Sequence, residues 1–449
     1  MKKFLKVLFF ISLFIIYNIR KELKIITTNN TEPKNITTNN TEPKNITINN
    51  TEPKKMDNKI SSSYNFGILI SDLKKNNATR KPKYILLFDL IDNKYCYDHN
   101  SYLIFQYYQE RNKTEAYYII NKDSDLYNSL LLKNKTNNLI LFDPEDKEFL
   151  KNLYPYLLNS KIIIYSYLLF EILHLVNEVN YLKCLKINHG IRYFKNRNYN
   201  ELTSLNKGKR NTIISSPYEY NIYKYKFNFL YKEIHKAGLP RFDRFDKIIK
   251  NKSEKECILI FFTYRSYDNA RYDISLLKEN IIKLLEDNTL ISFLKNKNID
   301  LIYIQHHYDI KRNRSFEFYN FTYAEYKRQT DLSHYIEQCS LLVTDFSSIS
   351  FDFIFQNKPS LFYLLDYNET FFYKEKMYIK IFPKSPFVIN NTFYDQNSLV
   401  NKILYYVQRE FKIEDDLKQK YENVFYYKNN ITERIVEIID NITEKNILD

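Results

Sequence analysis

Residues 340–353, Ser340-Leu-Leu-Val-Thr-Asp345-Phe-Ser-Ser-Ile-Ser-Phe-Asp-Phe353, decide the fold class of this chain. A short apolar run ends in a threonine and Asp345, and a helix-like spacing of apolar residues follows. This pattern is typical of a buried strand that leads into a helix. Free N–H groups at a helix N-terminus attract anions, and open α/β sheets bind ligands at the carboxyl ends of their strands. The stretch therefore predicts a binding site for a phosphate-bearing ligand, with Asp345, Ser347 and Ser348 at its centre.

Similar apolar runs recur along the chain in two series and predict further buried strands. They lie at residues 84–89, 116–120, 138–142, 161–165, 257–262, 300–305, 341–344 and 360–363. Helix-like stretches separate them, such as residues 144–157, and residues 396–449 are also expected to be helical. Alternation of strands and helices in two blocks indicates an α/β protein with two doubly wound, Rossmann-like domains that face a cleft. At 449 residues the chain is long enough for two such cores.

We place the two domains at residues 62–245 and 246–449, with the joint around residues 238–252. Before them, residues 1–21 carry an apolar run flanked by basic residues. The run is short for a membrane span, which needs about 20 residues. Because basic residues flank the apolar run, we still expect a membrane anchor, which either spans the bilayer or lies on its surface. An ordinary amphipathic helix is the alternative. Residues 22–61 contain three copies of a polar, Pro-punctuated decapeptide, which predict a disordered linker.

The net charge of +14 indicates anionic partners. Because the lysines are scattered rather than clustered, an anionic substrate and an anionic membrane surface explain the charge at least as well as a nucleic-acid partner does, and we expect no nucleic-acid partner. The four cysteines, Cys96, Cys184, Cys257 and Cys339, are far apart and form no CxxC pair. We therefore expect reduced thiols, with neither a metal site nor a disulfide framework.

Several polar residues follow the predicted strands and are candidates for chemistry. His189 and Gly190 come after a strand-like stretch, so the imidazole could act as a general base; a structural histidine in a turn is the alternative. His307 ends another strand and could donate to a phosphate oxygen. Arg241 could bind phosphate through both of its N–H edges, but a pair with an aspartate is an equally good interpretation.

Thr263 and Arg265 end the first strand of the second series and offer a hydroxyl and a guanidinium to the same ligand. The glycine patterns of dinucleotide-binding folds and P-loops are absent from the sequence, as is the Gly-x-Ser-x-Gly elbow. We therefore expect no bound cofactor.

Taken in order, these segments resemble the CDP-glycerol glycerophosphotransferase family, which includes teichoic-acid polymerases and primases and has a GT-B-like catalytic domain. The matching segments are His189-Gly190 with Lys195 (family W-H-G-x-x-x-K), Gly238-Leu-Pro-Arg241-Phe-Asp243 (G-x-P-R-x-D), Thr263-Tyr-Arg265 (P-T-x-R), His307-Tyr308 (R-M-H-Y), and Asp345-Phe-Ser347-Ser348 with Phe351-Asp352 and Lys358-Pro359 (D-Y-S-S…F-D…K-P). Asn188 departs from the pattern, since it stands where the family usually has Trp; Ile191-Arg192, Phe262 and Gln305 are further departures.

The resemblance implies an attack by an acceptor hydroxyl on the β-phosphate of CDP-glycerol or a related CDP-alditol, with release of CMP. On this hypothesis His189 is the general base, and His307 and Arg241 hold the phosphates. Thr263, Arg265, Asp345, Ser347 and Ser348 then contribute to donor binding, while Gly190, Lys195, Asp243 and Asp352 support the site. The acceptor is expected to be lipid-linked or a polymer of the teichoic-acid or capsular type, and a CDP-activated donor implies that the catalytic domains face the cytoplasm.

Two other functions are compatible with the sequence. A GT-B glycosyltransferase that uses a nucleotide sugar would share the fold and the diphosphate-binding site. A membrane-tethered protein that binds an anionic polymer without turnover would explain the positive charge, but it would give the histidines no role.

Overall fold

The computed structural model describes residues 82–444 except residues 90–98, 112–114, 144–145, 147–148, 167–175, 178, 180, 193–204, 246–254, 265–273, 307–308, 310–318, 328–331 and 366–384. The predicted anchor (1–21) and linker (22–61) lie outside these residues. No helix in the described part of the chain is both long and apolar enough to cross a membrane.

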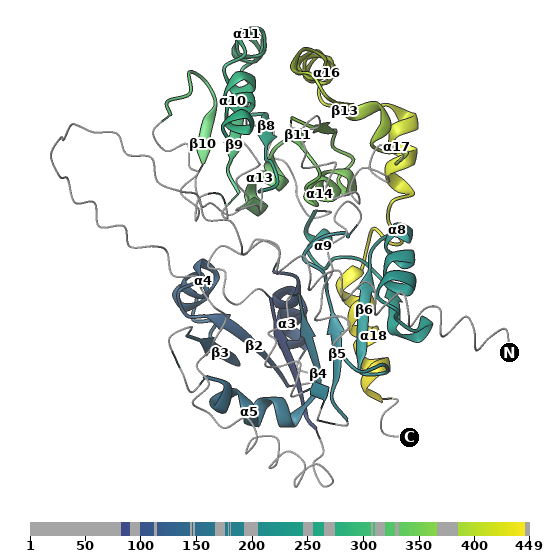
Figure 1. Ribbon diagram of the computed structural model, residues 1–449. Helices are drawn as coiled ribbons and strands as arrows, with labels where there is room; N and C mark the ends of the chain where they lie inside the picture. The colour runs from purple at the N-terminus through teal and green to yellow at the C-terminus, as the bar shows by residue number, and fades with distance from the viewer. Residues whose placement is uncertain are drawn as a thin grey trace, which may run out of the picture. The chain divides into compact units, whose positions relative to one another are not determined.

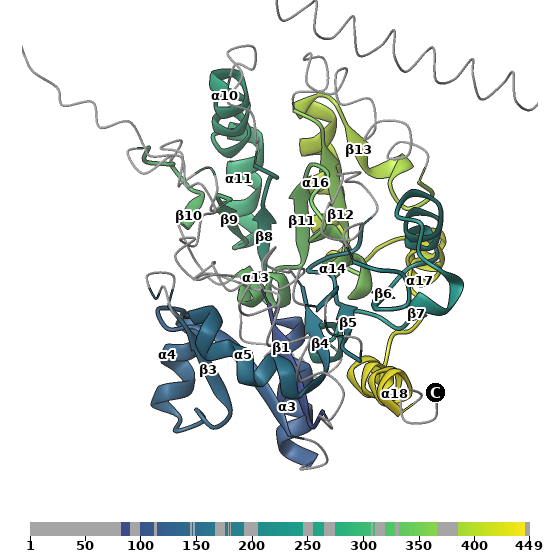
Figure 2. The ribbon, with the colours of Figure 1, turned by 60° about the horizontal axis from the view of Figure 1, so that its bottom comes forward.

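Two parallel β-sheets organise the described residues, as Figures 1 and 2 show. The first sheet has the strand order β3-β2-β1-β4-β5-β6-β7. Its strands are β1 (Tyr84–Phe88), β2 (Ala116–Asn121), β3 (Leu139–Phe142), β4 (Ser160–Tyr165), β5 (Lys183–Lys186), β6 (Arg210–Ile214) and β7 (Ile234–Lys236). The reversal of strand order between β1 and β4 is the topological switch point of a doubly wound sheet.

The second sheet has the order β10-β9-β8-β11-β12-β13. Its strands are β8 (Cys257–Ile260), β9 (Asp300–Ile304), β10 (Glu325–Lys327), β11 (Leu341–Thr344), β12 (Ser360–Tyr363) and β13 (Thr392–Phe393). All paired strands are parallel, and the central strands β8, β11 and β12 are buried along their whole length. The α/β prediction is therefore confirmed, and all eight apolar runs form strands, but β3 is an edge strand in which Phe142 alone is buried.

Helices connect the strands in both halves of the sequence. In the first half they are α3 (Asn100–Arg111), α4 (Asp125–Leu132), α5 (Phe149–Asn159), α8 (Pro217–Asn221) and α9 (Phe242–Phe245). In the second half they are α10 (Ile274–Leu285), α11 (Asn288–Lys297), α13 (Leu332–Gln338), α14 (Ser350–Phe355), α16 (Gln396–Gln408), α17 (Asp415–Glu422) and α18 (Ile431–Glu444). A π-helical turn (Ile222–Lys226) follows α8, and short 3₁₀ turns cover Tyr231–Glu233 and Ile389–Asn391.

The last helix, α18, packs on the first sheet although it belongs to the C-terminal part of the sequence. It contacts α3, α9 and β4, and it lies beside the strands of the first sheet in both ribbon views (Figures 1 and 2). The division into domains at residues 62–245 and 246–449 remains a prediction, but the two sheets fall on either side of that boundary and α18 crosses back over it.

One hydrophobic cluster runs from the first sheet into the second. At its centre the ring of Phe242 in α9 stacks on Phe355 of α14, with centroids 4.3 Å apart, and Phe425 packs against both rings. Separate clusters fill the other face of each sheet. Cys184, Cys257 and Cys339 are buried within these cores, and the Cys257 and Cys339 Sγ atoms lie 2.6 Å apart, while Cys96 lies outside the described residues. Apolar packing therefore joins the two halves next to the segments that carry the predicted site.

Candidate functional site

Asp345 joins the ends of two neighbouring strands of the second sheet. Its carboxylate is fully buried and accepts hydrogen bonds from the Thr263 backbone N–H (3.1 and 3.2 Å) and from the Thr263 hydroxyl (2.9 Å). Thr263 follows β8 and Asp345 follows β11, and these strands are paired. Since both carboxylate oxygens accept hydrogen bonds from Thr263, Asp345 fixes the carboxyl ends of β8 and β11 relative to each other.

The Ser347-Ser348 turn leads directly into α14. The N–H groups of residues 350–352 donate to the carbonyl oxygens of residues 347–349 at 3.0 to 3.2 Å. The first-turn amides of α14 therefore already have partners, which corrects the simple expectation that they lie open to an anion. Ser347 is buried, at 4% exposure, whereas Ser348 is partly exposed, so a ligand at this end would meet Ser348 first.

His189 lies on a turn that follows β5. Its side chain is exposed, whereas Asn188 and Gly190 on either side are buried. Gly190 touches the serine turn, since a Cβ added to it would lie 2.7 Å from Ser348 Oγ and 2.9 Å from Ser348 Cβ. Only a glycine fits this contact without displacement. The fold thus brings the His189 turn of the first sheet against the Ser347-Ser348 turn of the second.

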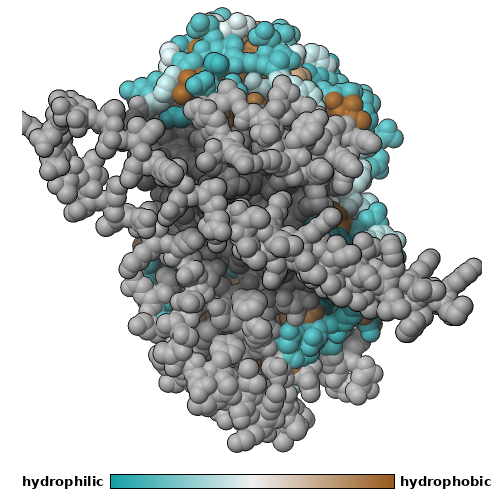
Figure 3. All heavy atoms as spheres, in the orientation of Figure 1, coloured by the Kyte–Doolittle hydropathy of each residue, from teal (hydrophilic) through white to brown (hydrophobic). Residues whose placement is uncertain are grey.

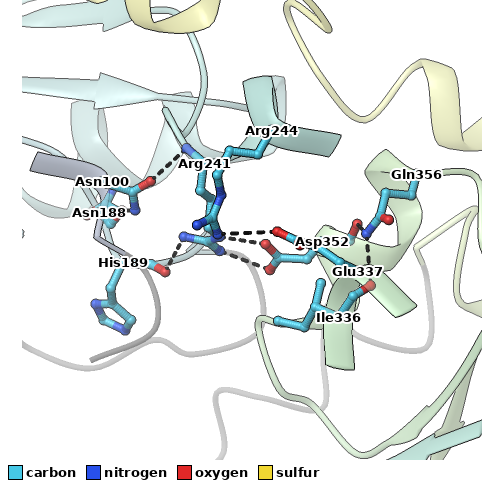
Figure 4. Close-up of polar contacts among 9 residues, drawn as sticks. All are labelled: Asn100, Asn188, His189, Arg241, Arg244, Ile336, Glu337, Asp352 and Gln356. Atoms are coloured by element: carbon cyan, nitrogen blue, oxygen red, sulfur yellow. Dashed lines mark hydrogen bonds and ion pairs between the residues drawn. The ribbon is translucent and has the colours of Figure 1, made fainter. Parts of the chain in front are cut away.

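Arg241 is buried between the His189 turn and α14 (Figure 4). Its Nε and Nη2 donate to the two carboxylate oxygens of Asp352 at 2.5 and 2.9 Å, and its Nη1 donates to the His189 carbonyl oxygen at 2.8 Å. In Figure 4 the His189 imidazole points away from the guanidinium, while the carbonyl oxygen points toward it. This geometry favours the Arg–Asp interpretation, because the side chain is 1% exposed and its charge is already balanced. A phosphate-binding role for Arg241 stays a prediction.

Asp243 also has a partner within the protein. Its carboxylate accepts from the backbone N–H groups of Ile431 (2.9 Å) and Thr432 (2.7 Å) at the start of α18. Lys195, Arg265 and His307, which the sequence also singled out, lie outside the described residues. The structure therefore brings together Gly190, Arg241, Asp352 and Ser348, pairs Thr263 with Asp345, and places Asp243 at α18.

Sequence reasoning missed a buried polar cluster behind His189. Its members are Asn100, Arg192, Ser215, Glu219 and Tyr223. One signal was present, since Ser216-Pro-Tyr-Glu219 has the Ser-x-x-Glu form of a helix start. No periodic pattern could have linked that helix to a turn near residue 190. Among the described residues, the His, Cys, Asp and Glu side chains form no cluster able to hold a metal ion.

Comparison with known proteins is consistent with this arrangement. Residues 74–441 match the model of the family described as CDP-Glycerol:Poly(glycerophosphate) glycerophosphotransferase. The chain is 25% identical over 394 residues to the minor teichoic acid biosynthesis protein GgaB of Bacillus subtilis (strain 168), which covers 82% of this chain and 41% of that protein. It is 25% identical over 310 residues to the teichoic acid glycerol-phosphate primase of the same organism, covering 63% of this chain and 74% of the relative.

Solved structures give the same fold. The wall teichoic acid polymerase TagF aligns with a TM-score of 0.57 at 15% identity, covering 85% of this chain and 94% of TagF. A putative UDP-N-acetylglucosamine 2-epimerase from Listeria monocytogenes aligns with a TM-score of 0.53 at 10% identity, covering 82% of this chain and 98% of that chain. At these identities the likeness shows the fold alone: an α/β architecture of Rossmann-like parallel sheets similar to that of GT-B enzymes.

Proposed function

The chain belongs to the CDP-glycerol:poly(glycerophosphate) glycerophosphotransferase family, and on that premise we propose that it transfers glycerol phosphate, or a related alditol phosphate, from a CDP-activated donor. The acceptor is a hydroxyl of a lipid-linked or polymeric molecule, in the synthesis of a teichoic-acid-like or capsular polymer. The chain spans 41% of the length of GgaB, so the proposal concerns the transferase activity of this chain and not the whole activity of that relative.

The observation that carries the proposal is the contact between the His189-Gly190 turn and the Ser347-Ser348 turn. The neighbour of the exposed His189, Gly190, contacts the Ser348 side chain at a strand end of the second sheet. A phosphoryl transfer needs a base for the incoming hydroxyl beside groups that bind the donor phosphates. Two turns from different sheets can supply these roles at one point of the molecule.

In the proposed reaction the acceptor oxygen attacks the β-phosphorus of the donor in line with the leaving group. The new bond joins the acceptor oxygen to phosphorus, the bond to the oxygen that bridges the two phosphates breaks, and CMP leaves with that oxygen. His189 accepts the acceptor's proton, because an imidazole titrates near neutral pH. Ser347 and Ser348 donate hydrogen bonds to the donor's phosphate oxygens. Asp345 keeps Thr263 and the strand ends in place.

The test of this function is the release of CMP. We expect the protein to release CMP from CDP-glycerol when a lipid-linked glycerol phosphate is supplied, and to release no UDP from UDP-sugars. His189→Ala should lower the rate by 10²- to 10⁴-fold, the usual contribution of a general base, with little change in melting temperature because the side chain is exposed. His334→Ala replaces another histidine, on α13, and should keep the wild-type rate. UDP release would favour the glycosyltransferase, and turnover of neither donor would favour the binding protein.

We also propose that residues 1–21 anchor the chain to the membrane and that the catalytic part faces the cytoplasm. The support is the apolar run with basic flanks and the supply of CDP-activated donors in the cytoplasm. Protease added to intact cells should leave the residues after 61 uncut. Cleavage of that region in intact cells would contradict the orientation.

A further inference from the structure

The buried side chain of Asn188 fixes the turn that carries His189 through hydrogen bonds. Its carboxamide oxygen accepts two hydrogen bonds, from the Tyr223 hydroxyl (2.8 Å) and from Arg192 Nε (3.1 Å). Its backbone carbonyl oxygen accepts a third from Asn100 Nδ2 (3.2 Å). Asn188 is 2% exposed, so these bonds are made in a dry environment, where polar contacts are strong and breaking them is costly.

The far end of the turn is fixed by Glu219. This carboxylate, 1% exposed, accepts from the Arg192 backbone N–H at 2.9 Å and from the Ser215 backbone N–H at 2.8 Å. Burial raises the pKa of Glu219 to about 7, although its hydrogen bonds and the Arg192 charge oppose that shift. Burial is the main cause of the raised pKa values of Tyr223 and Tyr426 and of the lowered pKa of Lys226. The Glu219 charge contributes to the raised pKa values of the two tyrosines, and the Arg192 charge contributes to the lowered pKa of Lys226.

Arg192 therefore connects both ends of the turn. Its backbone N–H is held by Glu219, and its side chain reaches back four residues to Asn188. Between these anchors, Gly190 and Ile191 are buried and only His189 is exposed. The carbonyl oxygen of His189 is in turn held by Arg241 (Figure 4). An exposed imidazole thus projects from a backbone with almost no freedom.

We propose that Asn188, Arg192, Glu219 and Tyr223 are positioning residues that fix the direction of the His189 side chain for proton transfer. The proposal rests on the proposed function, in which His189 is the base. The proposal includes no contact between these four side chains and a substrate. Their effect is geometric, since misplacing a reacting group by about 1 Å costs on the order of 10²-fold in rate. They should change kcat, because they act through His189. They should leave KM for the donor unchanged, because in the proposed function the nucleotide binds at the Ser347-Ser348 turn.

The decisive comparison uses Tyr223→Phe, which removes one hydroxyl and keeps the ring in its core. We expect kcat for CMP release to fall about tenfold, within the range set by a modest displacement of the base, while KM for CDP-glycerol stays unchanged. Tyr118→Phe is the matched control, because it removes another buried tyrosine hydroxyl, on β2 of the first sheet, which is bonded to Asp89 at 3.0 Å. That control should keep the wild-type kcat.

A second pair of variants separates positioning from stability. Asn188→Asp keeps an oxygen facing both Tyr223 and Arg192, although it loses the Nδ2 donor to the Ile213 carbonyl oxygen (3.4 Å), and should retain kcat within about tenfold. Asn188→Leu removes both the acceptor and the donor and should lose about 10²-fold. If Asn188→Leu does not fold, Tyr223→Phe and Asn188→Asp still decide the question. The His189 ring signal in an NMR spectrum, assigned by its loss in His189→Ala, should shift in Tyr223→Phe and stay in place in Tyr118→Phe.

The outcomes also separate this inference from the proposed function. If the wild-type protein releases no CMP from CDP-glycerol, the function fails. If the wild-type is active and His189→Ala is not, but Tyr223→Phe keeps the wild-type kcat and the His189 signal does not move, the positioning role is wrong and the function stands. An equal loss of kcat in Tyr118→Phe would show a general effect of stability and would also overturn the inference.

Discussion

At the scale of single residues, Arg241 and Asp352 form a buried ion pair between segments 111 residues apart. Replacing Arg241 by Ala leaves the Asp352 carboxylate buried without its counter-charge, and we expect the free energy of unfolding to fall by about 3–5 kcal/mol. The measurement is equilibrium denaturation in urea.

Arg244→Ala provides the control for that prediction. Arg244 Nη2 lies 3.7 Å from Glu337 Oε1, but these side chains are 32% and 25% exposed, so the loss should be about 0–1 kcal/mol. The double variant Arg241→Met/Asp352→Leu should recover much of the stability, because it leaves no unpaired charge. Equal costs for Arg241→Ala and Arg244→Ala would contradict the role of the buried pair.

At the scale of elements, the position of α18 depends on its N-terminus. Asp243 accepts from the N–H groups of Ile431 and Thr432, and a Cβ added to Gly238 would lie 2.8 Å from Ile431 Cδ1. A carboxylate at a helix N-terminus satisfies free donors and interacts favourably with the helix dipole. The short segment 238–243 therefore docks the C-terminal helix onto the first sheet.

Asp243→Ala should destabilise this docking by about 1–2 kcal/mol, as the loss of a helix cap does. Hydrogen exchange should become faster over residues 431–444 and remain unchanged in α16. Asp395→Ala is the mirror control, since Asp395 caps α16 through the Ser398 N–H at 2.8 Å. It should speed exchange in α16 alone. Unchanged protection of α18 in Asp243→Ala would show that apolar packing is sufficient to hold the helix.

At the scale of the whole molecule, Glu219 makes stability depend on pH. Because burial raises its pKa from 4.5 to about 7, the native state keeps this proton at pH values where the unfolded chain has lost it. Stability therefore falls as pH rises from about 4.5 to about 7 and levels off above that range, with a total change on the order of 3 kcal/mol from this group.

Comparing wild-type with Glu219→Gln isolates this contribution, since glutamine does not titrate. The wild-type free energy of unfolding minus that of Glu219→Gln should decrease between pH 4.5 and pH 7 in urea titrations. The variant also loses one acceptor toward the Arg192 or Ser215 N–H. That loss lowers its stability by the same amount at every pH, so it does not change the pH dependence of the difference. A difference that does not vary with pH would show that Glu219 is not shifted.

The sequence predicted the strands that are buried on both faces, because such strands carry nearly continuous apolar runs. β6, β7, β10 and the two-residue β13 escaped prediction for physical reasons. β6 begins with Arg210 and Asn211, whose polarity conceals a buried strand. In the fold the Arg210 guanidinium lies over the Phe229 ring and beside Glu233, but those partners come about twenty residues later. β7 and β10 are three residues long and leave no period to detect.

The candidate site could be predicted in part. The order of the His189, Arg241, Thr263 and Asp345 segments placed them near one another, as strand ends of the same fold. Whether Arg241 faces a phosphate or Asp352 could not be decided from the sequence, since the answer depends on the packing of α14 against the His189 turn. The polar cluster under that turn was missed for the same reason: Asn188 and Tyr223 meet across 35 residues.

Gly190 has one more consequence for the molecule as a whole. Its backbone lies against Ser348 with no room for a methyl group, so the smallest residue stands where the first half meets the second. The close approach of the histidine turn to the serine turn therefore depends on a residue without a side chain at position 190. Any larger residue there would have to displace the Ser348 side chain or move the two turns apart.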